Sequence, residues 1–194
     1  MGLPVVRSAT SSEQVQLVAT IVLSFAADPV ARWIWPDPHQ YLAHMPTFTR
    51  AFGGNAFSND GAHCTDDLSG AALWLLPGVH LDEEAMGEVM ENTVEAATGE
   101  ELHELFEQEA AYHPDGDYWF LPLIGVDPAC QGRGYGRALL EHALRQCDEQ
   151  QLPAYLTSTN PRNISLYQRH GFETLATLQV GSSPQFVPML REPR

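Results

Sequence analysis

Cysteine, charge and long apolar runs are all scarce in this sequence of 194 residues. The three cysteines, Cys64, Cys130 and Cys147, are odd in number and lack Cys-x-x-Cys spacing, which predicts neither a disulfide framework nor a metal site. Such cysteine usage fits a reducing, cytoplasmic location. No apolar run approaches the ~18 residues of a membrane span, and residues 1–6 lack a signal-peptide core, so we expect no membrane association.

Basic residues are few: 10 Lys and Arg stand against 25 Asp and Glu, a net charge of -15. This balance argues against binding to nucleic acid or to anionic membranes. It favours a cationic partner such as an amine, although acidity that only aids solubility explains the charge equally well. A hydrophobic content of 44% is ample for a core, and we expect a single domain over residues 1–194.

Hydrophobic periodicity and turn residues predict alternating strands and helices. A capping box at Ser11 and Gln14 opens the first helix, which Asp28-Pro29 ends, and an aromatic loop follows. Strands are expected over 5–9, 56–65, 71–76, 118–126, 154–158, 172–180 and 186–190, and helices over 15–25, 40–52, 82–109 (one or two), 135–150 and 161–170. This order predicts a mixed α/β sheet of about six to seven strands flanked by helices, not a doubly wound Rossmann fold.

Residues 124–140 read IGVDPACQGRGYGRALL, a strand, a Gly-rich loop and an amphipathic helix. Closely spaced glycines before a helix N-terminus suit a pyrophosphate. No lysine stands near the loop, which excludes a Walker motif, and the late position and Gly-x-Gly-x-Gly spacing do not fit a dinucleotide fingerprint. The pattern Gln131-x-x-Gly134-x-Gly136 closely resembles the coenzyme A loop of the GNAT superfamily of N-acetyltransferases.

A second motif, NPRNISLYQRHGF at residues 160–172, is similar to the GNAT segment that carries Asn, then Tyr, then Gly-Phe. Asn160, Tyr167 and Gly171-Phe172 match it, whereas Asn163 stands where the family usually has Ala. The resemblance implies that Asn160 contacts the pantetheine arm and that the Tyr167 hydroxyl lies near the thioester sulfur. Asn160 is equally readable as a helix N-cap, and Tyr167 as a packing aromatic.

The resemblance implies the GNAT acyl-CoA N-acyltransferase fold and acetyl-CoA as co-substrate. In that fold a bulge separates the strand before the loop from the next strand, and Pro122 fits a bulge because proline cannot donate to a ladder. Some phrases look most like the puromycin N-acetyltransferase branch. The implied cofactor contacts are Leu123, Ile124, Gly125, Val126, Gln131, Gly132, Arg133, Gly134, Tyr135, Gly136, Arg137, Asn160, Asn163 and Tyr167.

The predicted activity is transfer of an acetyl group to a small-molecule amine by direct attack, with Tyr167 as general acid. Trp33 and Trp35 are expected to wall the acceptor pocket. No single base is assigned among Glu104, Glu107, Glu109, His113, Asp115, Asp117, His80 and Asp82. A non-catalytic acyl-CoA-binding module and a protein (lysine or N-terminal) acetyltransferase stay as alternatives, and a homodimer is left open.

Overall fold

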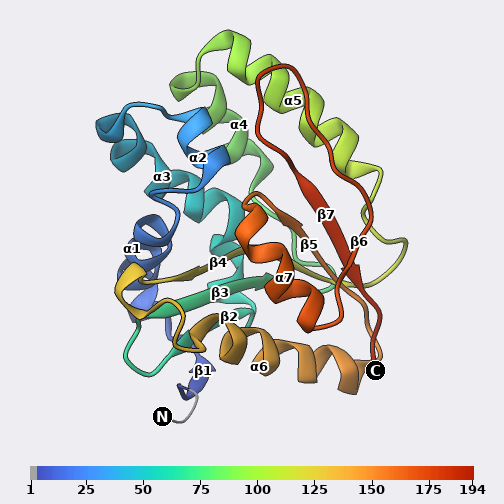
Figure 1. The fold of residues 1–194 in the computed structure, drawn as a ribbon. Helices are drawn as coiled ribbons and strands as arrows, with labels where there is room; N and C mark the ends of the chain where they lie inside the picture. Colours follow the sequence, from blue (N-terminus) through green and yellow to red (C-terminus); the bar gives the residue numbers. More distant parts are fainter. Residues whose placement is uncertain (1–3) are drawn as a thin grey trace.

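The computed structural model describes residues 4–194 and places seven strands in one mixed sheet, in the order β1-β2-β3-β4-β5-β7-β6 (Figure 1). Neighbouring strands are antiparallel except β4 and β5, which are parallel. The strands are β1 (Val6–Ser8), β2 (Ala62–Thr65), β3 (Gly70–Leu75), β4 (Trp119–Val126), β5 (Ala154–Ser158), β6 (Glu173–Thr174) and β7 (Val187–Arg191). The predicted mixed sheet is confirmed.

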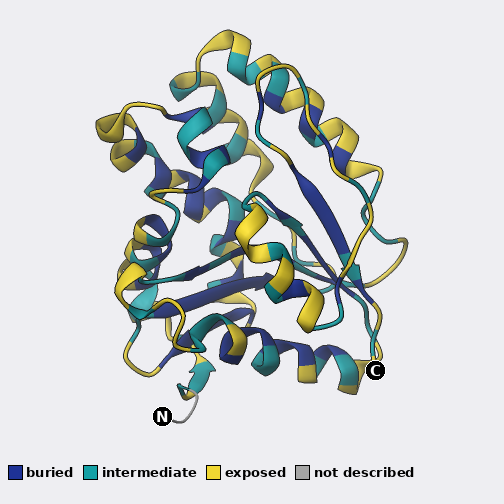
Figure 2. Ribbon diagram, in the orientation of Figure 1, coloured by how far each residue is buried: buried dark blue, intermediate teal, exposed yellow. Residues whose placement is uncertain are grey.

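Helices cover both faces of this sheet (Figures 1 and 2). They are α1 (Gln14–Ser24), α2 (Pro29–Ile34), α3 (Pro38–Gly53), α4 (Glu83–Thr93), α5 (Ala96–Ala110), α6 (Tyr135–Gln150) and α7 (Pro161–Arg169), with short 3-10 turns η1 (Ser11–Glu13), η2 (Gly54–Ser58) and η3 (Pro128–Cys130). One core lies between the sheet and α6 with α7, a second between the sheet and α1, and a third among α1 to α5.

Strand β3 shows how the sheet separates two of these cores. All of its side chains are buried; Ala72 and Trp74 face α6, whereas Leu73 and Leu75 face α1. Such alternation follows from the two-residue period of a strand. The buried run that follows Gly70 in the sequence is therefore a central strand with both faces covered.

Strand β4 contains the bulge that Pro122 predicts. Leu123 pairs with Leu73 and Phe120 with Leu75, so Leu121 and Pro122 together stand opposite one residue of β3. The extra residue reverses the alternation: Leu121 packs in the α6 core and Leu123 in the α1 core. The bulge thus re-aims every side chain of β4 that follows it.

Three local expectations in the first third of the chain are corrected. The capping box is formed by Thr10 and Glu13, not by Ser11 and Gln14. Helix α1 ends at Ser24, before Asp28. Asp28 is instead the N-cap of α2, with Pro29 at its first position, so part of the expected aromatic loop is helical. The strand expected over 56–65 is only β2, because residues 54–58 form η2.

The strand expected over 172–180 is reduced to β6. Leu175 donates to the Pro188 carbonyl, but proline has no N–H to return a second bond. The ladder therefore stops at Thr174, and only an isolated bridge between Leu178 and Phe186 follows.

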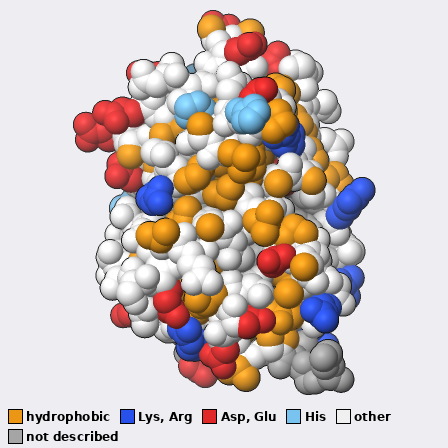
Figure 3. All heavy atoms as spheres, turned by 90° about the vertical axis from the view of Figure 1, so that its left-hand side faces the viewer, with side chains coloured by type: hydrophobic (Ala, Val, Ile, Leu, Met, Phe, Trp, Pro, Cys, Tyr) orange, Lys and Arg blue, Asp and Glu red, His pale blue; other side chains and the backbone are white. Residues whose placement is uncertain are grey.

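The face on which α1 and α3 lie carries scattered hydrophobic side chains (Figure 3). Val15 and Leu23 of α1 and Leu42 of α3 are the exposed large ones on these helices. The homodimer left open by the sequence stays a prediction. Among residues 4–194 no helix is long and apolar enough to cross a bilayer, and no group of three metal-ligating side chains is assembled there.

Candidate active site

The sheet opens between β4 and β5. The two strands pair only at Trp119 with Ala154 and Phe120 with Tyr155. Beyond the bulge, the segment from Leu123 to Val126 pairs with β3 on one side, and no described strand pairs with its other edge. Backbone polar groups on this edge are therefore free to bond an extended ligand, the position that the sequence predicts for the pantetheine arm.

Gly125 allows α1 to approach this half of β4. A Cβ atom there would stand 2.2 Å from Ser24 Oγ and 3.2 Å from the Ile21 Cα. The two residues before it carry side chains that pack in the cores: Leu123 is buried in the α1 core and Ile124 packs against the α6 core. Gly125 thus serves helix packing, and its backbone lies along the open edge.

The Gly-rich loop joins β4 to α6. Gly132 and Gly134 have φ of +72° and +88°, which side chains other than glycine rarely adopt, and α6 begins at Tyr135. Gly136 lies in the first turn of α6, where an added Cβ would meet Leu166 of α7 at 3.4 Å. The first N–H groups of a helix have no partner within it, so the loop and α6 together present donors suited to a phosphate.

Several side chains of the loop form hydrogen bonds or ion pairs with other residues of the protein. Gln131 Nε2 donates to the Val126 carbonyl over 3.1 Å, and Tyr135 Oη donates to Asp67 Oδ2 over 2.7 Å, which raises the pKa of Tyr135 to about 12. Arg137 Nε pairs with Glu141 over 2.7 Å, and Arg133 is exposed beside Cys130 Sγ. The bonds of Gln131 and Tyr135 hold the loop against the end of β4 and the turn between β2 and β3.

Helix α7 faces the opening from the other side. Asn160 is its N-cap and accepts a hydrogen bond from the Arg162 N–H over 3.1 Å. Tyr167 is buried, with its ring edge-on to Phe172, and it also borders a large cavity that Asn163 lines too. Burial raises the pKa of the Tyr167 hydroxyl above its ordinary value, and the nearby Asp28 carboxylate adds to this shift, so the hydroxyl stays protonated at neutral pH.

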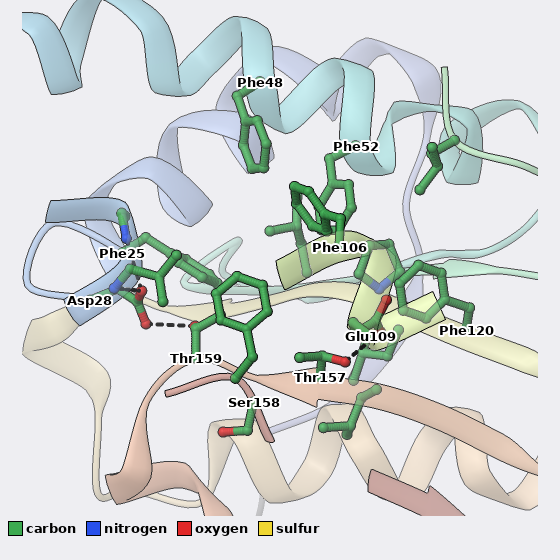
Figure 4. A pocket seen from close by; sticks show the side chains of 18 of the residues that line it. Phe25, Asp28, Phe48, Phe52, Phe106, Glu109, Phe120, Thr157, Ser158 and Thr159 are labelled. Atoms are coloured by element: carbon green, nitrogen blue, oxygen red, sulfur yellow. Dashed lines mark hydrogen bonds between the residues drawn. The ribbon is translucent and has the colours of Figure 1, made fainter. Parts of the chain in front are cut away.

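The cavity has a volume of about 380 Å³ and lies where β4 and β5 diverge, beneath the helices (Figure 4). Its wall is mostly apolar, with aromatic rings from several elements. They are Phe25, Trp35, Phe48, Phe52, Phe106, Phe120, Tyr167 and Phe186. The polar lining consists of Asp28, Glu83, Glu109, His113, Thr157, Ser158, Thr159 and Asn163.

Two buried carboxylates stand at separate places in this wall (Figure 4). Asp28 bonds to the N–H groups of Val30 and Ala31 through Oδ1, and its Oδ2 accepts from Thr159 Oγ1 over 2.8 Å. Burial raises the pKa of Asp28, although these bonds oppose the rise. Three groups therefore use both oxygens of Asp28.

Glu109, unlike Asp28, is hydrogen-bonded to ionisable side chains. Its Oε1 accepts from Tyr155 Oη over 2.6 Å and from Thr157 Oγ1 over 2.7 Å, and its Oε2 lies 3.1 Å from His113 Nε2. Burial works to raise the pKa of Glu109, but the hydrogen bond and charge of His113, with the two hydroxyl bonds, bring it below its ordinary value. Glu109 is therefore a buried carboxylate that stays ionised at neutral pH.

Some of the residues predicted to bind the acceptor or to act as the base line the cavity, and the others lie outside it. Trp35 is fully buried in the cavity wall, whereas Trp33 lies outside that wall and bonds to Ser182. Of the eight unassigned acids and histidines, only Glu109 and His113 line the cavity; Glu104, Glu107, Asp115, Asp117, His80 and Asp82 are exposed. The sequence did not predict that Asp28, Thr157 and the phenylalanines line the cavity, although Asp-Pro at residues 28–29 is a helix-start signal.

Residues 71–172 match the model of the acetyltransferase (GNAT) family, more than half of the chain, and the chain belongs to that family. Among curated proteins it is 28% identical over 142 residues to an uncharacterized N-acetyltransferase of Schizosaccharomyces pombe; the match covers 66% of this chain and 58% of that protein. The chain therefore spans little more than half of that relative's length.

Two solved structures show the same fold. One is described as histone acetyltransferase HPA2 and related acetyltransferase from Corynebacterium glutamicum, with a TM-score of 0.73 and 24% identity over 100% of this chain and 98% of that one. The other, Drosophila melanogaster polyamine N-acetyltransferase, has a TM-score of 0.69 and 16% identity over 97% and 99% of the two chains. At these identities the likeness extends to the fold alone.

Proposed function

We propose that the protein transfers the acetyl group of acetyl-CoA to a primary or secondary amine of a small molecule. The observation that supports this is the position of the cavity. It lies at the point where the open edge of β4, Tyr167 and two buried carboxylates meet. An apolar cavity with a few polar groups suits a small ligand, and a buried carboxylate suits an amine.

The proposed cofactor site uses the loop and the open edge. The pyrophosphate lies on the N–H groups of residues 131–137, and the pantetheine arm pairs with Leu123 to Val126. Both features fit acetyl-CoA, because positive-φ glycines let the loop backbone approach a phosphate and the free strand edge takes an extended amide chain. Asn160 and Asn163 border the arm from α7.

The proposed chemistry is direct transfer. The amine nitrogen attacks the thioester carbonyl carbon, and a backbone N–H at Leu123 or Ile124 stabilises the oxyanion. The carbon–sulfur bond then breaks, the sulfur takes the Tyr167 hydroxyl proton, and the proton that the nitrogen loses as the amide forms restores the Tyr167 hydroxyl. Tyr167 suits this step because its raised pKa keeps the proton in place until a thiolate forms beside it.

The proposed acceptor is a small molecule because a cavity of about 380 Å³ with a mostly apolar wall and a few polar groups is typical of a small-molecule site. Its aromatic wall favours an amine with an apolar body. We propose that the protein acts in a reducing compartment such as the cytoplasm. The free cysteines, of which Cys64 and Cys147 are buried, support this location.

Thiol release from acetyl-CoA in the presence of an amine panel tests this proposal. The panel contains 2-phenylethylamine, spermidine, agmatine, puromycin, free lysine and a lysine-containing peptide. Turnover with one of the small amines is expected, with acetyl-CoA alone as the blank. Turnover confined to the peptide would instead establish a protein acetyltransferase, and calorimetric binding of acetyl-CoA with no turnover would establish a binding module.

A further inference from the structure

Glu109 and His113 form a pair at the end of α5 that borders two cavities at once. Besides the cavity between β4 and β5, which we call the inner cavity, His113 lines an outer cavity of about 400 Å³ beside the loop from Leu76 to Leu81. The side chains common to both walls are Leu81, Glu83, His113 and Phe120. His113 therefore lies between the Glu109 carboxylate, which lines the inner cavity, and the outer cavity.

The hydrogen bonds of His113 suit a proton carrier. Its Nε2 lies 3.1 Å from Glu109 Oε2, and its Nδ1 lies 2.7 Å from Tyr118 Oη. Either partner oxygen can accept a proton from the ring, so a doubly protonated imidazolium would keep both bonds. In the neutral ring that accepts the proton, Nδ1 carries the hydrogen and donates to the Tyr118 oxygen, so Nε2 is unprotonated on the side of Glu109.

We propose that Glu109 and His113 together deprotonate the acceptor ammonium, with Glu109 binding it from the cavity and His113 taking the proton. This inference rests on the proposed acetyl transfer. One N–H bond of the ammonium breaks, and the proton passes by way of Glu109 Oε2 to His113 Nε2. The pair changes from carboxylate and neutral imidazole to carboxylate and imidazolium, and the amine keeps the electron pair with which it attacks.

The outer cavity gives the proton a way out. Tyr118 lines that cavity but not the inner one, and its hydroxyl is bonded to His113 Nδ1. The imidazolium can return its proton through Tyr118 to water on the outer side. Water then need not enter the apolar cavity where the thioester lies, which protects acetyl-CoA from hydrolysis.

Other ionisable groups face His113 from each neighbouring element. Tyr155 of β5 packs at 4.4 Å between ring centroids, and Glu83 of α4 shares both cavity walls. His80 and Asp117 line the outer cavity. Among all the groups around the ring, Glu109 is the one that both bonds to it and is buried, so it is the group placed to pass a proton to it.

Asp28 is a poorer candidate for the same task. Two of its bonds come from backbone N–H groups and the third from Thr159, so no ionisable group is bonded to it to take a proton onward. The choice of Glu109 follows from His113 beside it.

The test compares His113→Gln with wild type across pH, using the panel amine that wild type turns over fastest. We expect kcat/KM to fall by about 100-fold to 1,000-fold near neutral pH. The deficit should shrink below about tenfold near pH 10, because an alkyl amine with a pKa of about 10 then loses its proton in solution. Glu109→Gln should behave alike, and the double variant should lose little more than either single one.

The same helix offers a matched control. His103 and Glu107 form an exposed pair at 3.4 Å, so His103→Gln should leave kcat/KM and its pH profile unchanged. Acetyl-CoA binding by calorimetry should be equal in all variants. A His113→Gln deficit that is uniform across pH, or absent, would overturn the inference. Absence of turnover in wild type would instead overturn the proposed function.

Discussion

The two sides of the β4–β5 opening differ in which atoms form them. On the loop side, residues 127–137 present backbone N–H groups. Several of their side chains form hydrogen bonds or ion pairs with other residues of the protein. On the cavity side, the wall consists of side chains from α2 to α5, α7, β4 and β5, and from the segments after α1 and before β7. The loop side is one continuous stretch of sequence, whereas the cavity side is assembled from distant ones.

Under the proposed function, the cofactor binds to a backbone site and the acceptor binds to a wall of side chains. A backbone site depends on φ values that few residues allow, as at Gly132 and Gly134. A side-chain wall can be altered one residue at a time without disturbing the loop. If this division holds, variants on the loop side should alter acetyl-CoA binding, and variants on the cavity side should alter the use of the amine.

Tyr167 lies between the two sides, and its replacement should have the largest effect. We expect Tyr167→Phe to lower kcat by about 10²–10⁴, because the thiolate then leaves without a proton donor. Acetyl-CoA affinity and the KM of the amine should change little. Steady-state kinetics with thiol detection measures all three, and Tyr112→Phe, which lies outside the cavity wall, is the control. Full kcat in the Tyr167 variant, with chemistry rate-limiting, would show that another group protonates the sulfur.

On the loop side, Gly134→Glu should weaken acetyl-CoA binding by at least about 100-fold. A side chain at φ +88° is strained, and a carboxylate there repels the pyrophosphate. Gly99→Glu is the matched control, because it adds the same charge in α5 where an added Cβ meets no atom within 4 Å. Calorimetry measures both; equal affinity of folded Gly134→Glu and wild type would place the pyrophosphate elsewhere.

Much of the loop side could be predicted from sequence because local rules determine it. The glycine spacing, the start of α6 at Tyr135 and the bulge at Pro122 each depend on residues close together in the chain. The same holds for the C-terminus of α7, where Gly171 at φ +94° lets the Phe172 N–H bond to the Tyr167 carbonyl.

The cavity side could not be predicted in the same way. Thr157 and Glu109 are 48 positions apart, and Asp28 and Thr159 are 131 apart, so no spacing indicates their contacts. Trp33 and Trp35 look equivalent in sequence, but the turn of α2 buries Trp35 and leaves Trp33 half-buried. Only the packing of helices on the sheet selects Glu109 from the acids of α5.

Within the cavity, the two carboxylates should respond to pH with opposite sign. Burial raises the pKa of Asp28 above 3.8, so its contribution to stability is full below that value and is lost as pH rises through the folded pKa. The pKa of Glu109 is lowered from 4.5, so its contribution is present above that value and is lost as pH falls.

Urea unfolding of Asp28→Asn and Glu109→Gln at about pH 4 and about pH 7 tests this contrast. Relative to wild type, the Asp28 variant should gain stability as pH rises. The Glu109 variant should cost about 1–3 kcal/mol near neutral pH, because charge-assisted hydrogen bonds are lost, and less in acid. The same trend in both variants would mean that the two sites are electrostatically alike.

The smallest expected effect separates the two tryptophans. Trp35→Phe opens space in the cavity wall and loses the bond from Nε1 to Thr93, so the KM of the preferred amine should rise about fivefold, or about 1 kcal/mol. Trp33→Phe removes only a surface bond to Ser182 and should change that KM less than about twofold. Both KM values come from initial rates at saturating acetyl-CoA. Acetyl-CoA affinity, measured separately, should be unchanged in both variants, because neither tryptophan lies on the loop side. A larger effect at Trp33 would mean that the acceptor extends beyond the cavity to the surface beside Ser182.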